Sequence, residues 1–200
     1  MKSILILGMG KFGMHMAMKL AELDTEVMVV DKDEERLQEI LPYVTSAQIG
    51  NSTREDFLRS LGINNFDTCV VAIGGDFQSS LETTLLLKEL GAKHVISRAY
   101  SEIQSKILLR NGADQIVYPE KQLGEWTAIT VGLNNVFDYF AVDKDLGVFE
   151  VKIPQKWVGK SIFELDIRKK YGINILGIKR NEEIQLTITP DIAFEEDDTI

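Results

Sequence analysis

The sequence predicts an α/β fold in which helices cover both faces of a parallel sheet, followed by a bridging helix and a small α+β subdomain. Across residues 1–118, short apolar runs rich in β-branched residues alternate with longer amphipathic segments, which is the pattern of repeated βαβ units. From residue 119 onward the rhythm changes, and strand-like segments dominate. We therefore predict a sheet domain over 1–118, a bridging helix over 119–135 and a C-terminal subdomain over 136–200.

The first part alternates strands and helices regularly. The predicted strands are Ser3–Leu7, Glu26–Val30, Ser46–Ile49, Thr68–Ile73, His94–Ser97 and Gln115–Val117. The predicted helices are Lys11–Leu23, Asp33–Leu41, Thr53–Leu61, Phe77–Leu90 and Glu102–Asn111. In the first of these helices, Phe12, Met16 and Leu20 recur at i, i+4 and i+8, so they form one apolar stripe that can pack on the sheet.

The second part opens with a predicted amphipathic helix, Pro119–Gly132, whose proline is tolerated in a first turn. One further helix is predicted near Ser161–Tyr171. A last strand is expected to begin at Thr199–Ile200, so we expect the subdomain to be cut short at the end of this chain. The other predicted strands are Phe137–Val142, Val148–Ile153, Ile173–Lys179 and Gln185–Thr189.

Charge and composition exclude several classes of function. The 200 residues include 22 Lys and Arg against 31 Asp and Glu, and the resulting formal charge of −9 disfavours unspecific binding to nucleic acid or anionic lipid. The single cysteine, Cys69, excludes a disulfide framework and a cysteine-based zinc site. No uninterrupted apolar run approaches the ~18–20 residues of a membrane span. We therefore expect neither a nucleic-acid partner nor direct membrane insertion.

A glycine-rich segment, Gly8–Met9–Gly10–Lys11–Phe12–Gly13, separates the first predicted strand from the first helix. Gly8 permits a tight turn, Gly10 has no Cβ to obstruct a phosphate, and Gly13 lets the helix pack closely on the sheet. Backbone N–H groups at the helix N-terminus then face a diphosphate. Glycines in this place can also form a simple turn, but the preceding strand and the following helix favour a binding site.

The second predicted strand is followed by Asp31, 18 positions after Gly13. A carboxylate at this place accepts hydrogen bonds from both ribose hydroxyls of a dinucleotide and repels a 2′-phosphate. Together with the glycine segment, Asp31 predicts a Rossmann-like site for an adenine nucleotide, with NADP disfavoured.

Other strand ends are expected to complete this pocket, because ligands of open parallel sheets lie at the carboxyl ends of the strands. The three following strands lead into Asn51–Ser52, Gly74–Gly75–Asp76 and Arg98. The stretch Ala72–Ile73–Gly74 is small enough to let an adenosine lie against the backbone. A structural alternative exists for the first pair: Ser52 caps the next helix, and Glu55 completes a capping box. The two roles are compatible.

Charged residues around the pocket suggest further phosphate contacts. Lys11 and Arg98 would add positive charge, although each taken alone is typical of a solvated surface cation. Glu120 stands at the start of the bridging helix, where a carboxylate either complements the helix dipole or helps to hold a divalent cation on the phosphates. The predicted nucleotide site comprises Gly8, Gly10, Lys11, Phe12, Gly13, Asp31, Lys32, Asn51, Ser52, Ala72, Ile73, Gly74, Arg98 and Glu120.

No catalytic set accompanies this predicted site. His15 and His94 have no Ser, Cys or carboxylate motif beside them, and ~60 strand-rich residues are too few for a usual dehydrogenase catalytic domain. A nucleotide fold without catalytic residues is typical of a sensor, so we expect no enzymatic activity. Two other classes compete with this interpretation: a small NAD-dependent oxidoreductase, and a redox-sensing transcription regulator, which needs a basic DNA-reading helix.

Several motifs together resemble the regulator-of-potassium-conductance (RCK, or KTN) domain of KtrA- and TrkA-like cytosolic subunits in bacterial potassium uptake systems. They are GMGKFG at 8–13, VVD at 29–31, VAIG at 71–74, TTLLLKELGA at 83–92 and GADQIVYPEKQLG at 112–124. The stretch GKSIFELDIRKKYGINILGIKR at 159–180 is similar to the C-terminal regulatory subdomain of the same family. The resemblance therefore covers the whole chain, and the GxGKFG and YPEK forms favour the KtrA-like branch.

The resemblance implies a gating subunit in the cytoplasm, held at the inner face of the cell membrane by a KtrB- or TrkH-like potassium-translocating subunit. Chains of this family pair as homodimers and assemble into octameric rings. ATP or ADP, or NAD(H) in TrkA-like relatives, sets the shape of the ring and so the opening of the pore. A divalent cation, Mg²⁺ or Ca²⁺, is implied near Glu120.

Two implied details concern individual positions. Lys11 stands where KtrA-like members typically have arginine, which keeps the charge but loses the bidentate fork. In some relatives the second subdomain binds cyclic di-AMP, although core and surface roles also explain the matching residues. Those residues are Ile162, Arg168, Ile173, Asn174 and Pro190.

Overall fold

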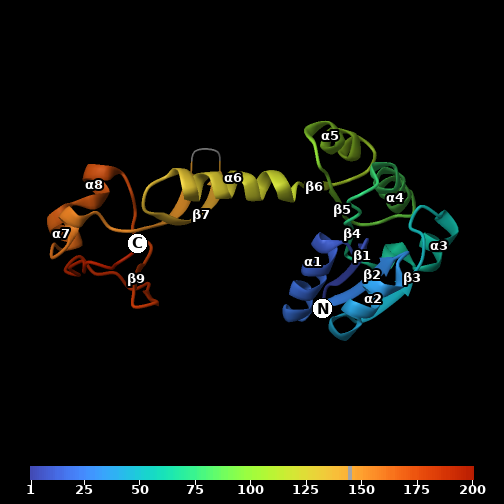
Figure 1. Cartoon of the computed structure of the whole chain (residues 1–200), viewed down its shortest axis with the longest axis horizontal. Helices are drawn as coiled ribbons and strands as arrows, with labels where there is room; N and C mark the ends of the chain where they lie inside the picture. Colours follow the sequence, from blue (N-terminus) through green and yellow to red (C-terminus); the bar gives the residue numbers. More distant parts are fainter. Residues whose placement is uncertain (144–145) are drawn as a thin grey trace. The chain divides into compact units, whose positions relative to one another are not determined.

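The structure is a computed structural model that describes residues 1–143 and 146–200. The chain divides into two compact units, Met1–Glu120 and Lys121–Ile200 (Figure 1). The division falls inside the first turn of helix α6, Pro119–Gly132. Each unit has an apolar core of its own.

The first unit is built on a six-stranded parallel sheet with the strand order β3-β2-β1-β4-β5-β6. Strand β1 lies between β2 and β4, and Leu7 at its end is in register with Val30 and Val71. The order reverses at this point, which makes the end of β1 the switch point of the sheet. The strands are β1 (Ser3–Leu7), β2 (Glu26–Asp31), β3 (Ser46–Ile49), β4 (Thr68–Val71), β5 (Val95–Arg98) and β6 (Gln115–Val117).

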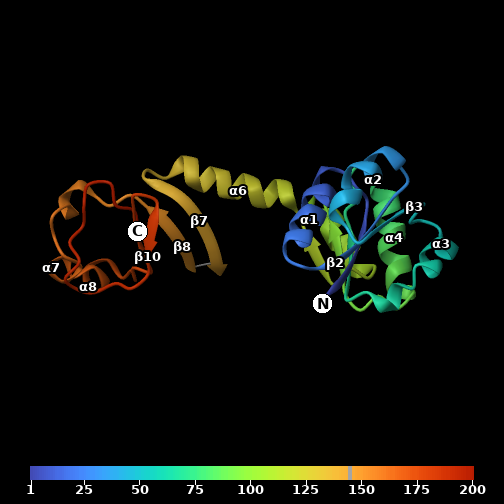
Figure 2. The ribbon, with the colours of Figure 1, turned by 90° about the horizontal axis from the view of Figure 1, so that it is seen from below.

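Helices cover both faces of this sheet (Figure 2). Ile4 and Ile6 of β1 enter the core beneath α1 (Lys11–Glu22) and α2 (Glu34–Ile40). Leu5 and Leu7 point to the opposite face, beneath α3 (Glu55–Ser60) and α4 (Phe77–Glu89). Helix α5 (Glu102–Arg110) packs on a smaller apolar cluster through Leu108. The predicted α/β fold class is therefore confirmed, and the central strand β1 is continuously apolar from Ile4 to Leu7 because both of its faces are buried.

Three strands differ from the prediction at their ends. Strand β5 is shifted by one residue and runs from Val95 to Arg98 instead of from His94 to Ser97. Strand β2 continues to Asp31, because Asp31 pairs in register with Ile49 of β3. Strand β4 stops at Val71, two residues before the predicted end at Ile73. The Ala72 N–H still donates to the Leu7 carbonyl at 2.8 Å, and the chain then leaves the sheet as a loop.

The second unit combines two antiparallel hairpins with short helices. Strands β7 (Val136–Asp143) and β8 (Leu146–Val151) form one hairpin, and β9 (Ile178–Arg180) and β10 (Glu183–Gln185) form the other. This content agrees with the predicted α+β class. The core residues are Ile153, Trp157, Leu165, Ile167, Ile178 and Phe194.

The prediction of a single helix over Ser161–Tyr171 is wrong. The structure has two short helices, α7 (Ile162–Leu165) and α8 (Ile167–Tyr171), separated by Asp166. Asp166 adopts a left-handed conformation with φ 47° and ψ 47°, which interrupts a right-handed helix. The break lets both Leu165 and Ile167 enter the core.

The predicted strands Ile173–Lys179 and Gln185–Thr189 are also misplaced. Only the end of the first overlaps β9, and β10 begins two residues before the second. A two-residue turn sets this register: Asn181 and Glu182 both have positive φ, of 51° and 66°, as a type I′ hairpin turn requires.

Helix α6 has no buried residue. Its apolar side chains are exposed, with Leu123 at 62% and Val131 at 81% of their full accessible area. Within the described residues, no helix combines the length and the apolar composition that a membrane crossing requires.

An ion pair ties the end of the chain to the core of the second unit. Asp198 is fully buried, and its two oxygens accept hydrogen bonds from Nε and Nη2 of Arg180, at 2.7 Å each. The Glu195 N–H adds a third hydrogen bond at 2.8 Å. Burial by itself raises the pKa of Asp198, but the hydrogen bonds and the charge of Arg180 outweigh burial and hold the pKa below its ordinary value.

We expect Asp198→Asn to lower the unfolding free energy of the second unit by about 2–3 kcal/mol at pH 7, because it removes one partner of a buried charged pair. Both tryptophans, Trp126 and Trp157, belong to this unit, so their fluorescence during urea unfolding provides the measurement. Asp197→Asn is the matched control: its carboxylate is 92% exposed beside Lys152, so the change should stay within about 0.5 kcal/mol. Equal losses in the two variants would contradict this account.

The same pair predicts an acid-sensitive second unit. Because the folded-state pKa of Asp198 lies below the unfolded value, its contribution is complete above pH ~4 and is lost as the pH falls further. The stability difference between the wild type and Asp198→Asn should therefore shrink below pH ~4. A difference that is constant from pH 7 to pH 3 would show that the carboxylate is not the titrating group.

Candidate functional site

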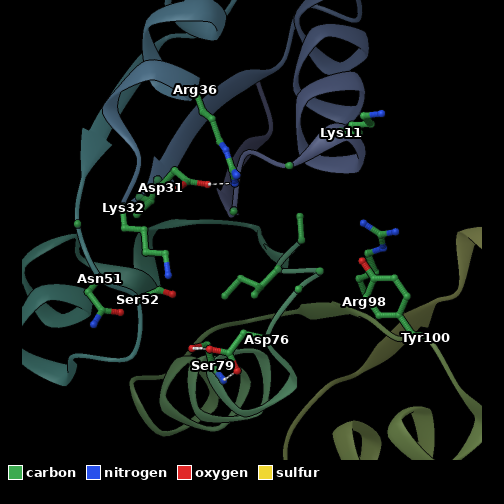
Figure 3. A pocket seen from close by; sticks show the side chains of 18 residues that line it. Lys11, Asp31, Lys32, Arg36, Asn51, Ser52, Asp76, Ser79, Arg98 and Tyr100 are labelled. Atoms are coloured by element: carbon green, nitrogen blue, oxygen red, sulfur yellow. Dashed lines mark hydrogen bonds and ion pairs between the residues drawn. The ribbon is translucent and has the colours of Figure 1, made fainter.

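A cavity of about 640 Å³ lies at the carboxyl edge of the first unit's sheet (Figure 3). The loop after β1 and the ends of β2, β3, β4 and β5 surround it. This is the switch point of the sheet, where open α/β folds bind their ligands. All residues of the predicted nucleotide site line the cavity except Phe12, Gly13 and Glu120.

Each of the three glycines in the loop is required for a different structural reason. Gly8 has φ +102°, and a Cβ there would lie 3.0 Å from the Ile73 backbone nitrogen. A Cβ on Gly13 would clash with the Gly8 carbonyl oxygen. Helix α1 can therefore pack against the turn at Gly8 only because position 13 has no side chain. Gly10 is different, because nothing lies within 4 Å of the position of its Cβ. The space beside Gly10 belongs to the cavity.

The N-terminus of helix α1 opens onto this space. Gly10 is the N-cap, no side chain caps the helix, and its first turn contains no acidic residue. The first helical hydrogen bond runs from the Met14 N–H to the Gly10 carbonyl at 2.9 Å. The backbone N–H groups of residues 11–13 precede that bond, and together with the helix dipole they suit an anion. In Figure 3 the Lys11 side chain extends from this end of the helix, away from Asp31.

Asp31 is 7% exposed and holds the glycine loop in place. Its Oδ2 accepts a hydrogen bond from the Met9 N–H at 2.5 Å, and its Oδ1 accepts one from the Asp33 N–H at 2.9 Å. Each carboxylate oxygen has a second lone pair. The arrangement can therefore accept hydrogen bonds from a diol while it also fixes the loop.

Two cations stand beside this carboxylate. Lys32 was predicted, whereas Arg36 was missed. Arg36 lies in the first turns of α2, with Nη1 3.9 Å from Asp31 Oδ2 and Nε 3.2 Å from Asp33 Oδ2. Arg36 could have been predicted from the sequence, because a residue in the first turns of the helix that follows Asp31 stays close to the end of the strand.

The capping role considered for Ser52 is wrong. Helix α3 begins at Glu55 with Arg54 as its N-cap, and no side chain caps it. Ser52 is nearly buried, and its Oγ lies 2.9 Å from Thr83 Oγ1 of α4. Asn51 instead accepts hydrogen bonds from the backbone and hydroxyl of Thr53, at 3.1 and 3.0 Å. Asn51 thus shapes the loop at the cavity wall, and Ser52 ties that loop to α4.

The loop after β4 supplies a narrow wall and a second carboxylate. Gly74 packs so closely on Tyr100 that a Cβ would clash with the Tyr100 hydroxyl. Asp76 caps helix α4, with Oδ1 accepting from the Ser79 N–H at 3.1 Å and Oδ2 accepting from the Ser79 hydroxyl at 2.6 Å. These hydrogen bonds lower the pKa of Asp76, so it is an anion at neutral pH.

Arg98 is the most enclosed cation of the cavity, with a side chain 12% exposed. Its guanidinium lies 4.4 Å from the ring centre of Tyr100 and 5.4 Å from that of Phe12. Phe12 therefore supports Arg98 from behind the cavity wall. Arg98 Nη2 donates to Oε1 of Glu120, whose side chain is half exposed. Tyr100, two residues beyond Arg98, was not predicted, and burial raises its pKa.

The structure does not bring together all residues of the two other predicted sites, the cation site at Glu120 and the second-ligand site of the C-terminal unit. Among the described residues, no group of three or more His, Cys, Asp or Glu side chains is placed to hold a metal ion, and Glu120 is engaged with Arg98. In the second unit, Ile173 and Asn174 line a separate cavity of about 640 Å³. Ile162 packs against the core, and the Pro190 carbonyl accepts from the Phe163 N–H at 2.9 Å.

Comparison with protein families gives two matches along the chain. The TrkA-N domain matches residues 4–119, and the TrkA-C domain matches residues 147–200. The first match coincides with the unit that contains the glycine loop and the cavity.

Individual relatives agree with these families. The chain is 38% identical over 197 residues to Ktr system potassium uptake protein C of Bacillus subtilis, covering 98% of this chain and 89% of that protein. It is 37% identical over 199 residues to Ktr system potassium uptake protein A of the same organism, covering 100% and 90%. Among solved structures, the GsuK channel bound to NAD aligns with TM-score 0.70 at 17% identity, over 99% of this chain and 36% of that one. The chain therefore belongs to the TrkA-N/TrkA-C family, as its resemblance to RCK domains predicted.

Proposed function

We propose that this chain is the nucleotide-sensing regulatory subunit of a potassium transporter or channel, and that ATP and ADP are its ligands. The Ktr relatives support the potassium system. The cavity supports the ligand, and one observation carries most of the weight: an uncapped helix N-terminus opens onto empty space beside Gly10. A diphosphate fits such a place because backbone N–H groups and the helix dipole both favour an anion.

The adenosine would lie toward Asp31, with the ribose diol on the carboxylate and the phosphates on the glycine loop. Lys11 and Arg98 would then face the distal phosphates, and Lys32 and Arg36 would flank the ribose. A divalent cation would bind through the phosphates, with Glu120 as the nearest predicted ligand.

The types of residue that line the cavity support a regulatory, non-enzymatic role. The described residues that line the cavity include no histidine or cysteine. Burial raises the pKa of Cys69 to about 12, so its thiol is not a nucleophile at neutral pH. Nucleotide binding would act by favouring one conformation of the assembly, where a coupling of about 1–3 kcal/mol per site is typical.

We also propose that the chain acts as part of an oligomer. Exposed apolar residues of α6 and β7, among them Leu123, Val131 and Phe140, supply a surface suited to self-association. We propose homodimers that form an octameric ring on a membrane-embedded potassium-translocating subunit, in the cytoplasm at the inner face of the membrane. Cyclic di-AMP is the proposed second ligand, at Ile162, Arg168, Ile173, Asn174 and Pro190.

NAD(H) is the second candidate ligand, because the GsuK channel, whose fold matches over the whole chain, was solved with NAD. Another GsuK structure was solved with ADP and aligns at TM-score 0.57 and 18% identity. Both ligands share the adenosine diphosphate that the glycine loop would hold. Calorimetric titration of the full chain with ATP, ADP and NADH separates the candidates, and binding of NADH alone would contradict the ATP/ADP proposal.

Gly10→Ala should weaken binding of every adenine nucleotide by about tenfold or more, because the new methyl group occupies the space reserved for phosphate. The fold should remain intact, because nothing lies within 4 Å of that Cβ. Calorimetry measures the affinity and thermal unfolding measures the stability. Gly124→Ala on α6, which also has free space and lies outside the cavity, is the control. Unchanged affinity in Gly10→Ala would refute the phosphate site.

Asp31 makes a prediction about the sugar. The wild type should bind ATP about tenfold more tightly than 2′-deoxy-ATP, since a hydrogen bond to a charged acceptor is lost. Asp31→Asn should bind the two ligands with similar affinity, because the charged acceptor is gone. This comparison within each variant cancels any effect of Asp31 on the loop. A wild type that does not distinguish the two sugars would place the ribose elsewhere.

A further inference from the structure

Two oppositely charged side chains, Lys32 and Asp76, line the cavity together. Lys32 directly follows β2, and Asp76 is the N-cap of helix α4. The loops that carry them follow β2 and β4, the two strands that flank β1. In Figure 3 Lys32 extends from the end of β2 toward the start of helix α4, where Asp76 and Ser79 lie. A hydrogen-bond donor and an acceptor from two different loops therefore approach the same part of the cavity.

The Asp76 carboxylate is fixed in place. Its oxygens accept hydrogen bonds from the Ser79 N–H and the Ser79 hydroxyl, at 3.1 and 2.6 Å. These hydrogen bonds lower the pKa of Asp76, and the positive charge of Lys32 lowers it further. Each oxygen keeps a lone pair for another donor. A ligand group beside Asp76 is therefore favoured if it donates a hydrogen bond, and it is repelled if it is a carbonyl or phosphate oxygen.

Lys32 differs from Asp76 because its charged group can move. The ammonium carries three N–H donors on a flexible four-carbon stem. It can reach an acceptor of the ligand, and its charge offsets that of Asp76, which would otherwise disfavour an anionic ligand in this cavity. This part of the cavity therefore offers one fixed acceptor and one adjustable donor.

In the proposed nucleotide site, the base lies at this part of the cavity. With the phosphates on the glycine loop and the ribose on Asp31, the base continues past Asp31, and Lys32 is the next residue along the chain. Ala72 and Ile73 also line the cavity, and their apolar groups suit the flat face of a purine. The edge of the base then meets Lys32 and Asp76.

We propose that Asp76 and Lys32 select adenine by its edge: Asp76 accepts a hydrogen bond from the 6-amino group, and Lys32 donates one to the neighbouring ring nitrogen. The inference rests on the proposed nucleotide site and adds to it the residues that choose the base. Adenine presents a donor beside an acceptor along this edge. Hypoxanthine has a carbonyl oxygen in place of the amino group, and that oxygen would face a fixed anion. Selection therefore combines a matched pair with a repulsive contact.

The test compares ATP with inosine triphosphate (ITP), in which hypoxanthine replaces adenine, by calorimetric titration of the full chain. The wild type should bind ATP about tenfold more tightly than ITP, since hypoxanthine loses a hydrogen bond to a charged acceptor. Asp76→Asn should bind the two within about twofold, because an amide can accept from an amino group or donate to a carbonyl oxygen. Asparagine is also a good N-cap, so helix α4 should persist, and thermal unfolding checks this.

Asp33→Asn is the matched control for Asp76→Asn. Asp33 is the N-cap of helix α2 and accepts from the Glu35 N–H at 3.1 Å, but it is not among the residues that line the cavity. This variant should keep the wild-type preference for ATP over ITP. Lys32→Met removes the charge and keeps most of the stem, and it should weaken ATP binding about three- to tenfold, because a charged donor is lost.

Three results would overturn this selection of the base. The first is a wild type that binds ATP and ITP equally well. The second is an Asp76→Asn variant that keeps the full preference for ATP. The third is an equal loss of affinity for both nucleotides in Asp76→Asn, which would restrict Asp76 to its role as a helix cap.

Failure of the proposed function gives a different result, because the wild type would then bind neither ATP nor ITP. If NADH is the ligand instead, the same comparison uses NADH and its hypoxanthine analogue. The same outcomes then support or overturn the roles of Asp76 and Lys32.

Discussion

The close contact between Gly13 and the Gly8 carbonyl is the constraint on which the arrangement of the site depends. It brings the start of helix α1 against the turn that follows β1, with no side chain in between. Asp31 reinforces the turn from the neighbouring strand through the Met9 N–H. As a result, an uncapped helix N-terminus faces the carboxyl edge of the sheet at its switch point, and the empty space beside Gly10 becomes a place for a phosphate.

Local charge matters more than net charge in this protein. The chain carries a formal charge of −9, yet Lys11, Lys32, Arg36 and Arg98 line one cavity. The field inside a partly enclosed cavity is set by the nearest charges, because distant surface charges are screened by salt. An acidic protein can therefore present a site that selects anionic ligands.

Short-range patterns made much of the fold and the site predictable. The glycine spacing and Asp31 predicted the turn between β1 and α1, because each position meets a steric or hydrogen-bonding demand within one βαβ unit. Arg36 and Tyr100 were missed although they lie within five residues of predicted positions. The break at Asp166 was missed as well, because a left-handed aspartate inside an otherwise helical pattern reflects how Leu165 and Ile167 reach one core.

The sequence by itself determined the order of the elements, the glycine loop and the family, because periodicity and local motifs follow from neighbours along the chain. Only the tertiary structure decided which partner each polar side chain takes. Ser52 bonds Thr83 instead of capping a helix, and Glu120 meets Arg98 across 22 positions of sequence. Such pairs depend on how strand ends converge at one edge of the sheet, and no local pattern encodes that distance.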